Sequence, residues 1–402
     1  MSLLNQNSSI GYLRSDGRKG IRNLVIIAYL VECAHHVARE VASKFKDQPV
    51  QLIGFGGCYP NSYADKMMNK LCTHPNVGAV LLISLGCESF NRTRLHQTIE
   101  QSGRPVKLLG IQHAGGTINS INEGVEFIKY AIEKVKEAPI VQMELSDFVV
   151  GVVCGGSDAT SGITANPAVG KAFDILIKSN ATAIFENTGE MIGLDDVLSR
   201  RAITNELATE LKNSVLKASK YYSIMGHGSF APGNAEGGLS TLEEKSLGAY
   251  CKTGSSMISG MIKPGDFPTR KGLFLMDIVP DGDPRFGFPN PNDSSEIIEL
   301  IASGAHCVLF TTGRGSVVGS AISPVIKVCA NPATYTRMKD DMDINAGRIL
   351  SNEVTTEEVG QEIVEAIYKL SNGGKSCSEK LGHQEFVLGY KTFEPIGPAC
   401  QP

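Results

Sequence analysis

A series of apolar runs constrains this sequence most, because each run ends in glycine or polar residues and is followed by a stretch with helical periodicity. The runs occupy residues 24–30, 50–55, 77–86, 106–111, 148–153, 181–186, 272–279 and 305–313. Strands that are apolar along their whole length are typical of parallel sheets covered on both faces. Residues 37–45, 123–135 and 204–222 carry apolar side chains near a 3.6-residue period, which predicts amphipathic helices. We therefore expect an α/β protein with mainly parallel sheets flanked by helices.

The acidic, proline-containing connector between residues 135 and 147 separates two groups of runs. At about 150 residues per domain, 402 residues suffice for two or three domains. We expect a first α/β domain over residues 1–144 and a second, catalytic α/β domain over residues 145–402. The segment after Asn372 is predicted to be an extended tail on the surface.

Composition excludes several classes of function. Lys and Arg number 38 against 42 Asp and Glu, a net charge of −4, which argues against a large nucleic-acid footprint. No apolar run reaches the ~18 residues of a membrane span, and the N-terminus lacks the pattern of a signal peptide. The ten cysteines are interpreted as thiols. We expect a soluble cytoplasmic protein with neither nucleic-acid nor membrane partners.

Three cysteines and one carboxylate follow the predicted strands of the first domain. In open α/β sheets, ligands bind beyond the carboxyl ends of the strands. Cys33, Cys58, Cys87 and Glu88 stand at such positions. The thiols could hold an iron–sulfur cluster or a soft metal, although no CxxC spacing is present and free cysteine is often an apolar filler. Glu88 is the more informative residue, because a carboxylate at a strand end is seldom part of the core.

The loop after the run at 148–153 reads CGGSDATSGITANP and contains Cys154, Ser157 and Asp158. Asn166 followed by Pro167 predicts an N-cap and the first turn of a helix. A helix N-terminus has free N–H groups and partial positive charge, so it suits an anion. The alternative is a capped turn that needs glycine for its backbone, but this does not account for Asp158.

Two carboxylates, Glu186 and Glu190, follow the run at 181–186. If this stretch is helical, the pair shares one face and could hold a divalent cation. If it is a solvated turn, the pair has no such role.

Residues 226–248 form the densest glycine-rich polar segment and contain His227, Asn234 and Lys245. Ser240 or Thr241 is expected to cap a helix with an acidic first turn. That interpretation leaves His227 and Lys245 unexplained, and either could act as a base if burial tuned its pKa.

The last strand exit, TTGRGSVVG, contains Thr312, Arg314 and Ser316. Its glycines superficially resemble a dinucleotide fingerprint, but the spacing differs from GxGxxG. Backbone N–H groups with one arginine fit a carboxylate clamp better.

Several long motifs together resemble the altronate/galactarate dehydratase family. They are GRKGIRN (17–23), LGCE (85–88), CGGSDATSGITANPA (154–168), APGNAEGGLSTLEEKSLG (231–248), TTGRGS (311–316) and DDMDINAG (340–347). The resemblance runs nearly end to end. It implies a lyase that removes water from a sugar acid to give a 2-keto-3-deoxy acid, aided by Fe²⁺, Mn²⁺ or another divalent metal.

The implied chemistry gives these residues roles. Removal of the proton α to a carboxylate builds negative charge that the site must stabilise. We expect Lys245 or His227 to be the base and Asp158 to act in catalysis. Glu88, Glu186 and Glu190 are the expected metal ligands, with Cys33, Cys58 and Cys87 as the alternative; an iron–sulfur cluster is the less favoured cofactor. The expected substrate-binding residues are Ser157, Thr164, Asn166, Asn234, Thr312, Arg314 and Ser316.

Departures from the family pattern bear on the substrate. The sugar-acid enzymes of the family begin with a small SAF domain that has no counterpart in these 402 residues. We therefore expect a split form, with a separate small SAF-domain subunit. Val153 stands where relatives often have Glu. The segment GGCYPNS (56–62) also differs from the Gly-Cys-Ser-Gln of the sugar-acid members. The chain resembles the beta subunit of (2R)-sulfolactate sulfo-lyase as well, which eliminates sulfite to give pyruvate. The expected ligand is a small anionic 2-hydroxy acid, and the sequence leaves self-association into a homo-oligomer open.

Overall fold

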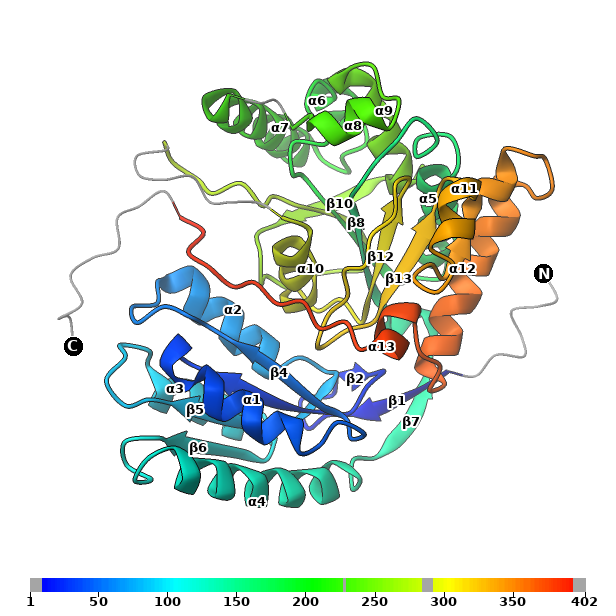
Figure 1. Cartoon of the computed structure of the whole chain (residues 1–402). Helices are drawn as coiled ribbons and strands as arrows, with labels where there is room; N and C mark the ends of the chain where they lie inside the picture. Colours follow the sequence, from blue (N-terminus) through cyan, green and yellow to red (C-terminus); the bar gives the residue numbers. More distant parts are fainter. Residues whose placement is uncertain (1–8, 227–228, 284–291, 393–402) are drawn as a thin grey trace.

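The structure, a computed structural model, describes residues 9–226, 229–283 and 292–392. Two parallel sheets lie one above the other in Figure 1, with a short antiparallel sheet beside the lower one. This arrangement confirms the expected α/β class.

The lower sheet contains four parallel strands in the order β4-β3-β5-β6. They are β3 (Leu24–Tyr29), β4 (Val50–Gly54), β5 (Val77–Ser84) and β6 (Val106–Gly110). Its helices are α1 (His35–Ser43), α2 (Ser62–Cys72), α3 (Arg92–Gln101) and α4 (Thr117–Val135). Alternate residues of β3 and β5 enter two different cores: one lies against α1 and α4 and the other against α2 and α3. Burial on both faces explains why these strands are apolar throughout.

The antiparallel sheet joins the two parts of the chain. It pairs β1 (Ser9–Leu13) with β2 (Lys19–Gly20) on one side and with β7 (Ile140–Met143) on the other. The chain then enters the upper sheet at Val149.

The upper sheet contains seven parallel strands in the order β10-β11-β9-β8-β12-β13-β14. They are β8 (Val149–Cys154), β9 (Thr182–Glu186), β10 (Ile258–Ile262), β11 (Gly272–Met276), β12 (Cys307–Thr312), β13 (Val325–Cys329) and β14 (Ile344–Asn345). Strands after β8 are added first on one side and then, from β12, on the other. The order therefore reverses between β8 and β12, and ligands of open α/β sheets bind beyond the carboxyl ends of the strands at such a point.

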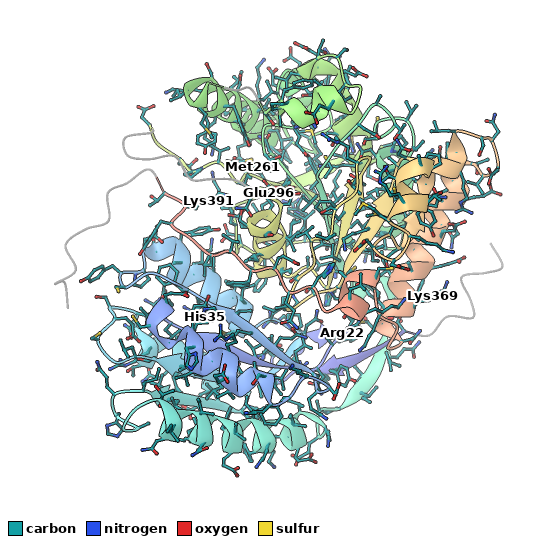
Figure 2. The ribbon with its side chains drawn as sticks, in the orientation of Figure 1. Arg22, His35, Met261, Glu296, Lys369 and Lys391 are labelled. Atoms are coloured by element: carbon teal, nitrogen blue, oxygen red, sulfur yellow. The ribbon has the colours of Figure 1, made fainter. Side chains whose placement is uncertain are left out.

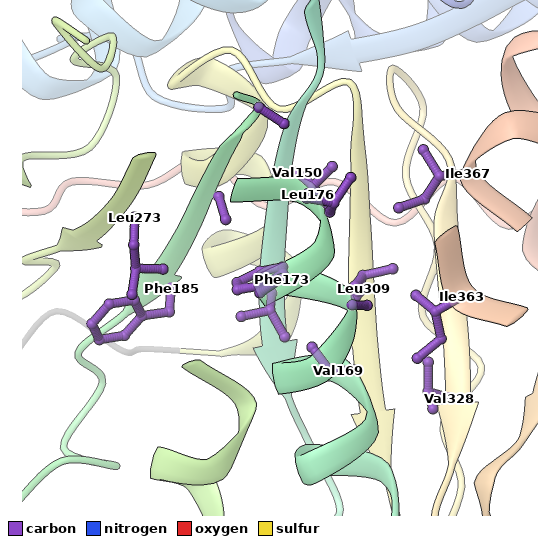
Figure 3. Close-up of a cluster of buried hydrophobic side chains, with 14 of the residues drawn as sticks. Val150, Val169, Phe173, Leu176, Phe185, Leu273, Leu309, Val328, Ile363 and Ile367 are labelled. Atoms are coloured by element: carbon purple, nitrogen blue, oxygen red, sulfur yellow. The ribbon is translucent and has the colours of Figure 1, made fainter. Parts of the chain in front are cut away.

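Helices surround the upper sheet and extend from its carboxyl end. They are α5 (Ala165–Lys178), α6 (Asp195–Ser199), α7 (Asn205–Met225), α8 (Pro232–Glu236), α9 (Leu242–Tyr250), α10 (Asp293–Ala302), α11 (Pro332–Arg337), α12 (Thr356–Ser371) and α13 (Cys377–Leu381). Figure 3 shows α5 and α12 packing on one face of the sheet, with Phe173 among side chains of β8 and β12.

The opposite face of the upper sheet is covered by α10 and by the lower part of the molecule. One apolar cluster contains residues of β8 and α10 together with residues of α2 and β3. Glu299 of α10 accepts hydrogen bonds from Tyr63 of α2 (2.6 Å) and from Lys391 near the C-terminus (2.7 Å). The two sheets therefore share a core and a polar contact across their junction.

The C-terminal segment was predicted to be an extended tail, and this is correct only in part. Residues 377–381 form α13, which Ser376 caps with its side chain. Residues 382–392 run along the junction between the two sheets (Figure 1), where Leu388 is buried in the shared core. Among the residues that the structure describes, no helix is long and apolar enough to cross a membrane.

Candidate active site

The loops that follow β8 and β12 meet at the point where the strand order reverses. Gly155 donates its backbone N–H to Thr311 (3.1 Å), and Arg314 donates its backbone N–H to Gly156 (2.8 Å). Gly156 has a φ of +62°, a conformation that favours glycine. The glycines of this loop thus allow two strand exits to run side by side.

A cavity of about 710 Å³ opens beside these loops, at the carboxyl end of β8 and β9. Its walls come from the ends of β8 and α7, the loop after β9, the segment before α8, and the first turns of α9 and α10. The described lining residues are Cys154, Thr188, Glu190, Tyr222, Met225, Ser229, Phe230, Ala231, Pro232, Lys245, Asn292, Asp293 and Glu296. Lys245, a predicted base, therefore shares one cavity with three carboxyl groups.

A buried ion pair forms the floor of this region. Lys252, in the 3₁₀ turn after α9, donates to Glu190 and lies 3.4 Å from the Cys154 sulfur. The Cys154 thiol donates to the other oxygen of Glu190 (2.7 Å). Burial by itself raises the pKa of Glu190, but Lys252, Lys245 and these hydrogen bonds hold that pKa below its usual value. Glu190 is therefore ionised, whereas burial raises the pKa of Cys154 to about 12 and keeps it a thiol.

Glu186, the last residue of β9, is fully buried next to this pair. Neither of its carboxyl oxygens has a hydrogen-bond partner among the described residues. Burial, and then the negative charge of Glu296, raises its pKa well above the usual value, so Glu186 is held as a neutral acid. Residues 187–194 form turns and not a helix, so the helical i, i+4 arrangement of Glu186 and Glu190 was wrong.

Two further carboxyl groups enter the cavity from the first turn of α10. The Asp293 carboxylate packs against Gly155, where a Cβ atom would lie 2.3 Å from Asp293 Oδ2. Burial and then the charge of Glu190 raise the pKa of Asp293 to about 6. Glu296 is 6% exposed, and burial followed by the charges of Asp293 and Glu190 raises its pKa to about 8.

Lys245 extends from α9, which begins as expected with the Thr241 side chain accepting from the Glu244 backbone (3.1 Å). Its side-chain nitrogen donates to the carbonyl of Ser229, which also lines the cavity. Lys245 also lines a second, smaller cavity of about 230 Å³, next to Ser157, Asp158 and Asn166. The other predicted base, His227, lies outside the described residues.

Asp158 is held by its own loop. One carboxylate oxygen accepts from the Thr160 backbone (2.9 Å) and hydroxyl (2.6 Å), and the other accepts from Asn331 (3.0 Å). Gly313 packs directly on this carboxylate, since a Cβ there would lie 2.0 Å from Asp158 Oδ1. These contacts show Asp158 organising the loop beside the small cavity.

The start of α5 differs from the prediction. The helix begins at Ala165, with Thr164 in the N-cap position, so Asn166 lies inside the first turn and does not cap it. Asn166 donates to the Gly248 carbonyl of α9 (2.9 Å). Thr164 is fully buried and donates to the carbonyls of Thr160 (2.8 Å) and Ala330 (3.0 Å). Asn166 therefore fastens α5 to α9.

The remaining predicted substrate-binding residues make local contacts. The Asn234 side chain accepts from the Ala231 backbone (2.9 Å), and the Ser157 hydroxyl lies 3.8 Å from the Cys154 sulfur. Thr312 and Ser316 accept from backbone N–H groups of their own loop, at Gly315 (3.0 Å) and Val318 (3.3 Å) respectively.

Arg314 is exposed and bonded to a neighbouring helix. Its guanidinium donates to the Gly233 carbonyl (2.5 Å) and to Glu236 of α8 (2.9 Å). A carboxylate clamp at this position would require the substrate to replace Glu236.

The candidate residues of the first part of the chain lie apart from this cavity. Glu88 accepts from Ser84 and from the Gly86 backbone (2.8 Å) at the end of β5 in the lower sheet. Cys33, Cys58 and Cys87 are exposed free thiols.

The three expected metal ligands do not come together among the described residues, because Glu88 lies at the end of β5, apart from Glu186 and Glu190. Among the described residues, no three His, Cys, Asp or Glu side chains are grouped so that they could hold a metal ion. Both oxygens of Glu190 are already bonded, to Cys154 and Lys252. Dependence on Fe²⁺ or Mn²⁺ therefore stays a prediction.

Sequence reasoning missed Lys252, Asp293, Glu296 and Tyr222. Asp293 and Glu296 follow Asn292, which caps α10, so in the sequence they are indistinguishable from the acidic first turn of any helix. No local signal marks Lys252, because its importance comes only from burial beside Glu190.

Two family models match the chain over nearly its whole length. "D-galactarate/Altronate dehydratase, C-terminal" matches residues 145–393, and "D-galactarate dehydratase/Altronate hydrolase, second domain" matches residues 11–136. The chain belongs to the D-galactarate/altronate dehydratase family. The cavity lies within the part that the C-terminal model matches.

Curated relatives within this family include enzymes with different leaving groups. The (2R)-sulfolactate sulfo-lyase subunit beta of Chromohalobacter salexigens is 32% identical, over 94% of this chain and 96% of that protein. Altronate dehydratase of Bacillus subtilis is 29% identical over 96% of this chain and 78% of that protein. Galactarate dehydratase (L-threo-forming) of Escherichia coli is 32% identical over 91% of this chain and 73% of that protein. These relatives are all lyases, as the resemblance of the sequence implied.

Proposed function

We propose that this protein is a hydro-lyase that eliminates water from a sugar acid such as altronate or galactarate and yields a 2-keto-3-deoxy acid. The observation that carries the proposal is that Lys245 shares one cavity with the carboxyl groups of Asp293 and Glu296. β-Elimination of water needs a base at the α-carbon and an acid at the leaving oxygen, and this cavity offers groups of both kinds.

Lys245 is the proposed base. It takes the proton from the carbon next to the substrate carboxylate, and the ammonium group that results lies beside the negative charge of the enediolate. The Ser229 carbonyl, which accepts from Lys245, directs the amine across the cavity. His227 is the alternative base. Arg314 and the start of α5 near Asn166 are proposed to bind the substrate carboxylate, and Asp158 orders the loop between them.

The second candidate is elimination of sulfite from (2R)-sulfolactate. It is favoured by the similarity to the sulfo-lyase subunit beta, which covers nearly the full length of both chains. Sulfite leaves as a stable anion and needs no proton, so this reaction makes less use of the carboxyl groups in the cavity.

A direct assay separates the two candidates. The purified chain is incubated with altronate, galactarate or (2R)-sulfolactate, and 2-keto acid and sulfite are measured in parallel. Keto acid without sulfite from a sugar acid is expected. Pyruvate with sulfite from sulfolactate alone would replace the primary proposal by the second.

The same assay tests the proposed cofactor and partner. Each substrate is tested with Fe²⁺, with Mn²⁺ and with a chelator, because metal dependence is expected from the family. A separate small SAF-domain protein is added in a parallel series, since the chain is proposed to act with such a subunit. Light scattering during size-exclusion chromatography determines whether the chain also associates with itself.

A further inference from the structure

Glu296 presents a carboxyl group to the cavity that also contains Lys245. It lines the cavity from the first turn of α10 and is 6% exposed. Its backbone N–H donates to the Asn292 carbonyl (3.1 Å), but its carboxyl oxygens make no hydrogen bond or ion pair with the described residues. The oxygens of Glu190 are bonded to Lys252 and Cys154. Glu299, one turn further along α10, is bonded to Tyr63 and Lys391. Glu296, like Asp293, is thus a cavity-lining carboxyl group that has no side-chain partner among the described residues and can contact a bound molecule.

The surroundings of Glu296 favour its protonated form. Asp293 and Glu299 lie on the same helix, Glu190 and Glu186 come from the end of β9 and its loop, and Lys391 comes from the C-terminal segment. Figure 2 labels Glu296 on α10 and Lys391 on the segment that crosses the junction. Burial and the surrounding carboxyl groups outweigh the ammonium group of Lys391, and the pKa of Glu296 rises to about 8. A carboxyl group held in this way can donate a proton at neutral pH.

We propose that Glu296 is the catalytic acid that donates its proton to the hydroxyl group leaving the β-carbon of the substrate. This inference rests on the proposed function and adds to it a residue with a defined step. It predicts that the protein discriminates between leaving groups that need a proton and leaving groups that do not.

The base takes the α-proton, and the electron pair of that C–H bond forms the double bond between the α- and β-carbons. The C–O bond at the β-carbon breaks, and its oxygen leaves with the Glu296 proton as water. The enol then becomes the 2-keto acid. The base holds one proton more and Glu296 one fewer, so proton transfer through water restores both.

The test compares two leaving groups on one carbon skeleton. The substrate is altronate or galactarate, whichever the wild-type protein turns over, and the probe is the 3-deoxy-3-fluoro analogue of the same acid, because fluoride departs with less need of a proton. For Glu296→Gln we expect kcat with the hydroxyl substrate to fall by about 100-fold or more, and kcat with the fluoro analogue to fall by less than about fivefold. Exposed Glu243→Gln serves as the matched control and changes neither rate.

A second readout locates the lost step. In D₂O, mass spectrometry of recovered substrate measures exchange of the α-hydrogen, which needs the base but not the acid. Glu296→Gln is expected to retain exchange while elimination is lost. Equal loss of exchange and elimination, equal loss for both leaving groups, or no loss at all would each overturn the assignment.

A measurement on the wild-type protein covers the case in which Glu296→Gln does not fold. Above about pH 8, kcat with the hydroxyl substrate should decrease relative to kcat with the fluoro analogue, because Glu296 loses its proton; a constant ratio rejects the proposal. If the wild-type protein neither exchanges the α-hydrogen nor forms keto acid from any acid tested, the proposed function itself has failed. If the wild-type protein exchanges the α-hydrogen and forms keto acid while Glu296→Gln behaves like wild type, only the assignment of Glu296 as the acid has failed.

Discussion

The ammonium group of Lys252 is buried against the carboxylate of Glu190, with side-chain exposures of 0% and 5%. The pair sits beneath the cavity and connects the end of α9 to the loop after β9. Because a buried charge is costly unless it is compensated, each partner requires the other.

Lys252→Met is expected to lower the free energy of unfolding by about 3–5 kcal/mol, since it leaves Glu190 charged and unpaired. Urea denaturation measures this change. Lys129→Met is the control, because Lys129 pairs with Glu126 on the surface and such pairs contribute less than about 1 kcal/mol. The double variant Lys252→Met, Glu190→Leu should recover much of the loss. A cost for Lys252→Met no larger than that for Lys129→Met would contradict the assignment.

The stability of the protein should depend on the ionisation of Glu296. Its pKa is about 8 in the folded protein against about 4.3 in an unfolded chain, so folding favours the protonated form. The resulting stabilisation is complete below about pH 4 and is lost as the pH rises towards 8, by at most about 1.4 kcal/mol per pH unit. Denaturation of wild type and Glu296→Gln between pH 5 and 8 should show the variant gaining relative stability as the pH rises. Parallel curves would show that the carboxyl group titrates normally.

Gly155→Ala should disturb both stability and turnover. A methyl group there would lie 2.3 Å from the Asp293 carboxylate and 2.5 Å from the Phe310 ring, so helix α10 or the loop must move. We expect a loss of about 1–3 kcal/mol in the free energy of unfolding and a lower kcat. Gly389→Ala is the matched control, since nothing lies within 4 Å of its Cβ position. Equal behaviour of the two variants would mean that the loop has room for a side chain.

Lys245→Ala should abolish turnover without unfolding the protein. The base is proposed to contribute at least about 100-fold to kcat, whereas the only hydrogen bond of its side chain among the described residues is to Ser229. Thermal unfolding and keto acid formation are measured together, with exposed Lys171→Ala as control. If Lys245→Ala retains turnover, the base role passes to His227, and His227→Ala becomes the decisive variant.

The fold class could be predicted because its signal is local. Strands such as β5 are buried at every position because both faces of a parallel sheet are covered, and this burial is visible in the largely apolar composition of the run. Caps with a Ser or Thr side chain are similarly local, and Thr241 was predicted to be a candidate cap for this reason. The start of α5 was misplaced because Asn166 bonds to Gly248, a residue 82 positions away.

The candidate site could be predicted only in part. Lys245 and Glu190 were named from their segments, and the structure brings them to one cavity. Glu88 was expected among the same ligands, but it lies at the end of β5 in the other sheet. The order in which strands join a sheet decides which strand exits meet, and no single segment contains that order.

The sequence by itself determined the α/β class, the family and the loops that carry its motifs, because hydrophobic periodicity and motif order are properties of the chain alone. Only the tertiary structure decided the chemical state of the groups in those loops. Three glutamates of this region differ in state. Glu186 is buried without a hydrogen-bond partner among the described residues, and Glu190 is ionised and paired with Lys252. Glu296 lines the cavity and is protonated at neutral pH. Their difference arises from burial and neighbouring charge, which exist only once the segments are packed together.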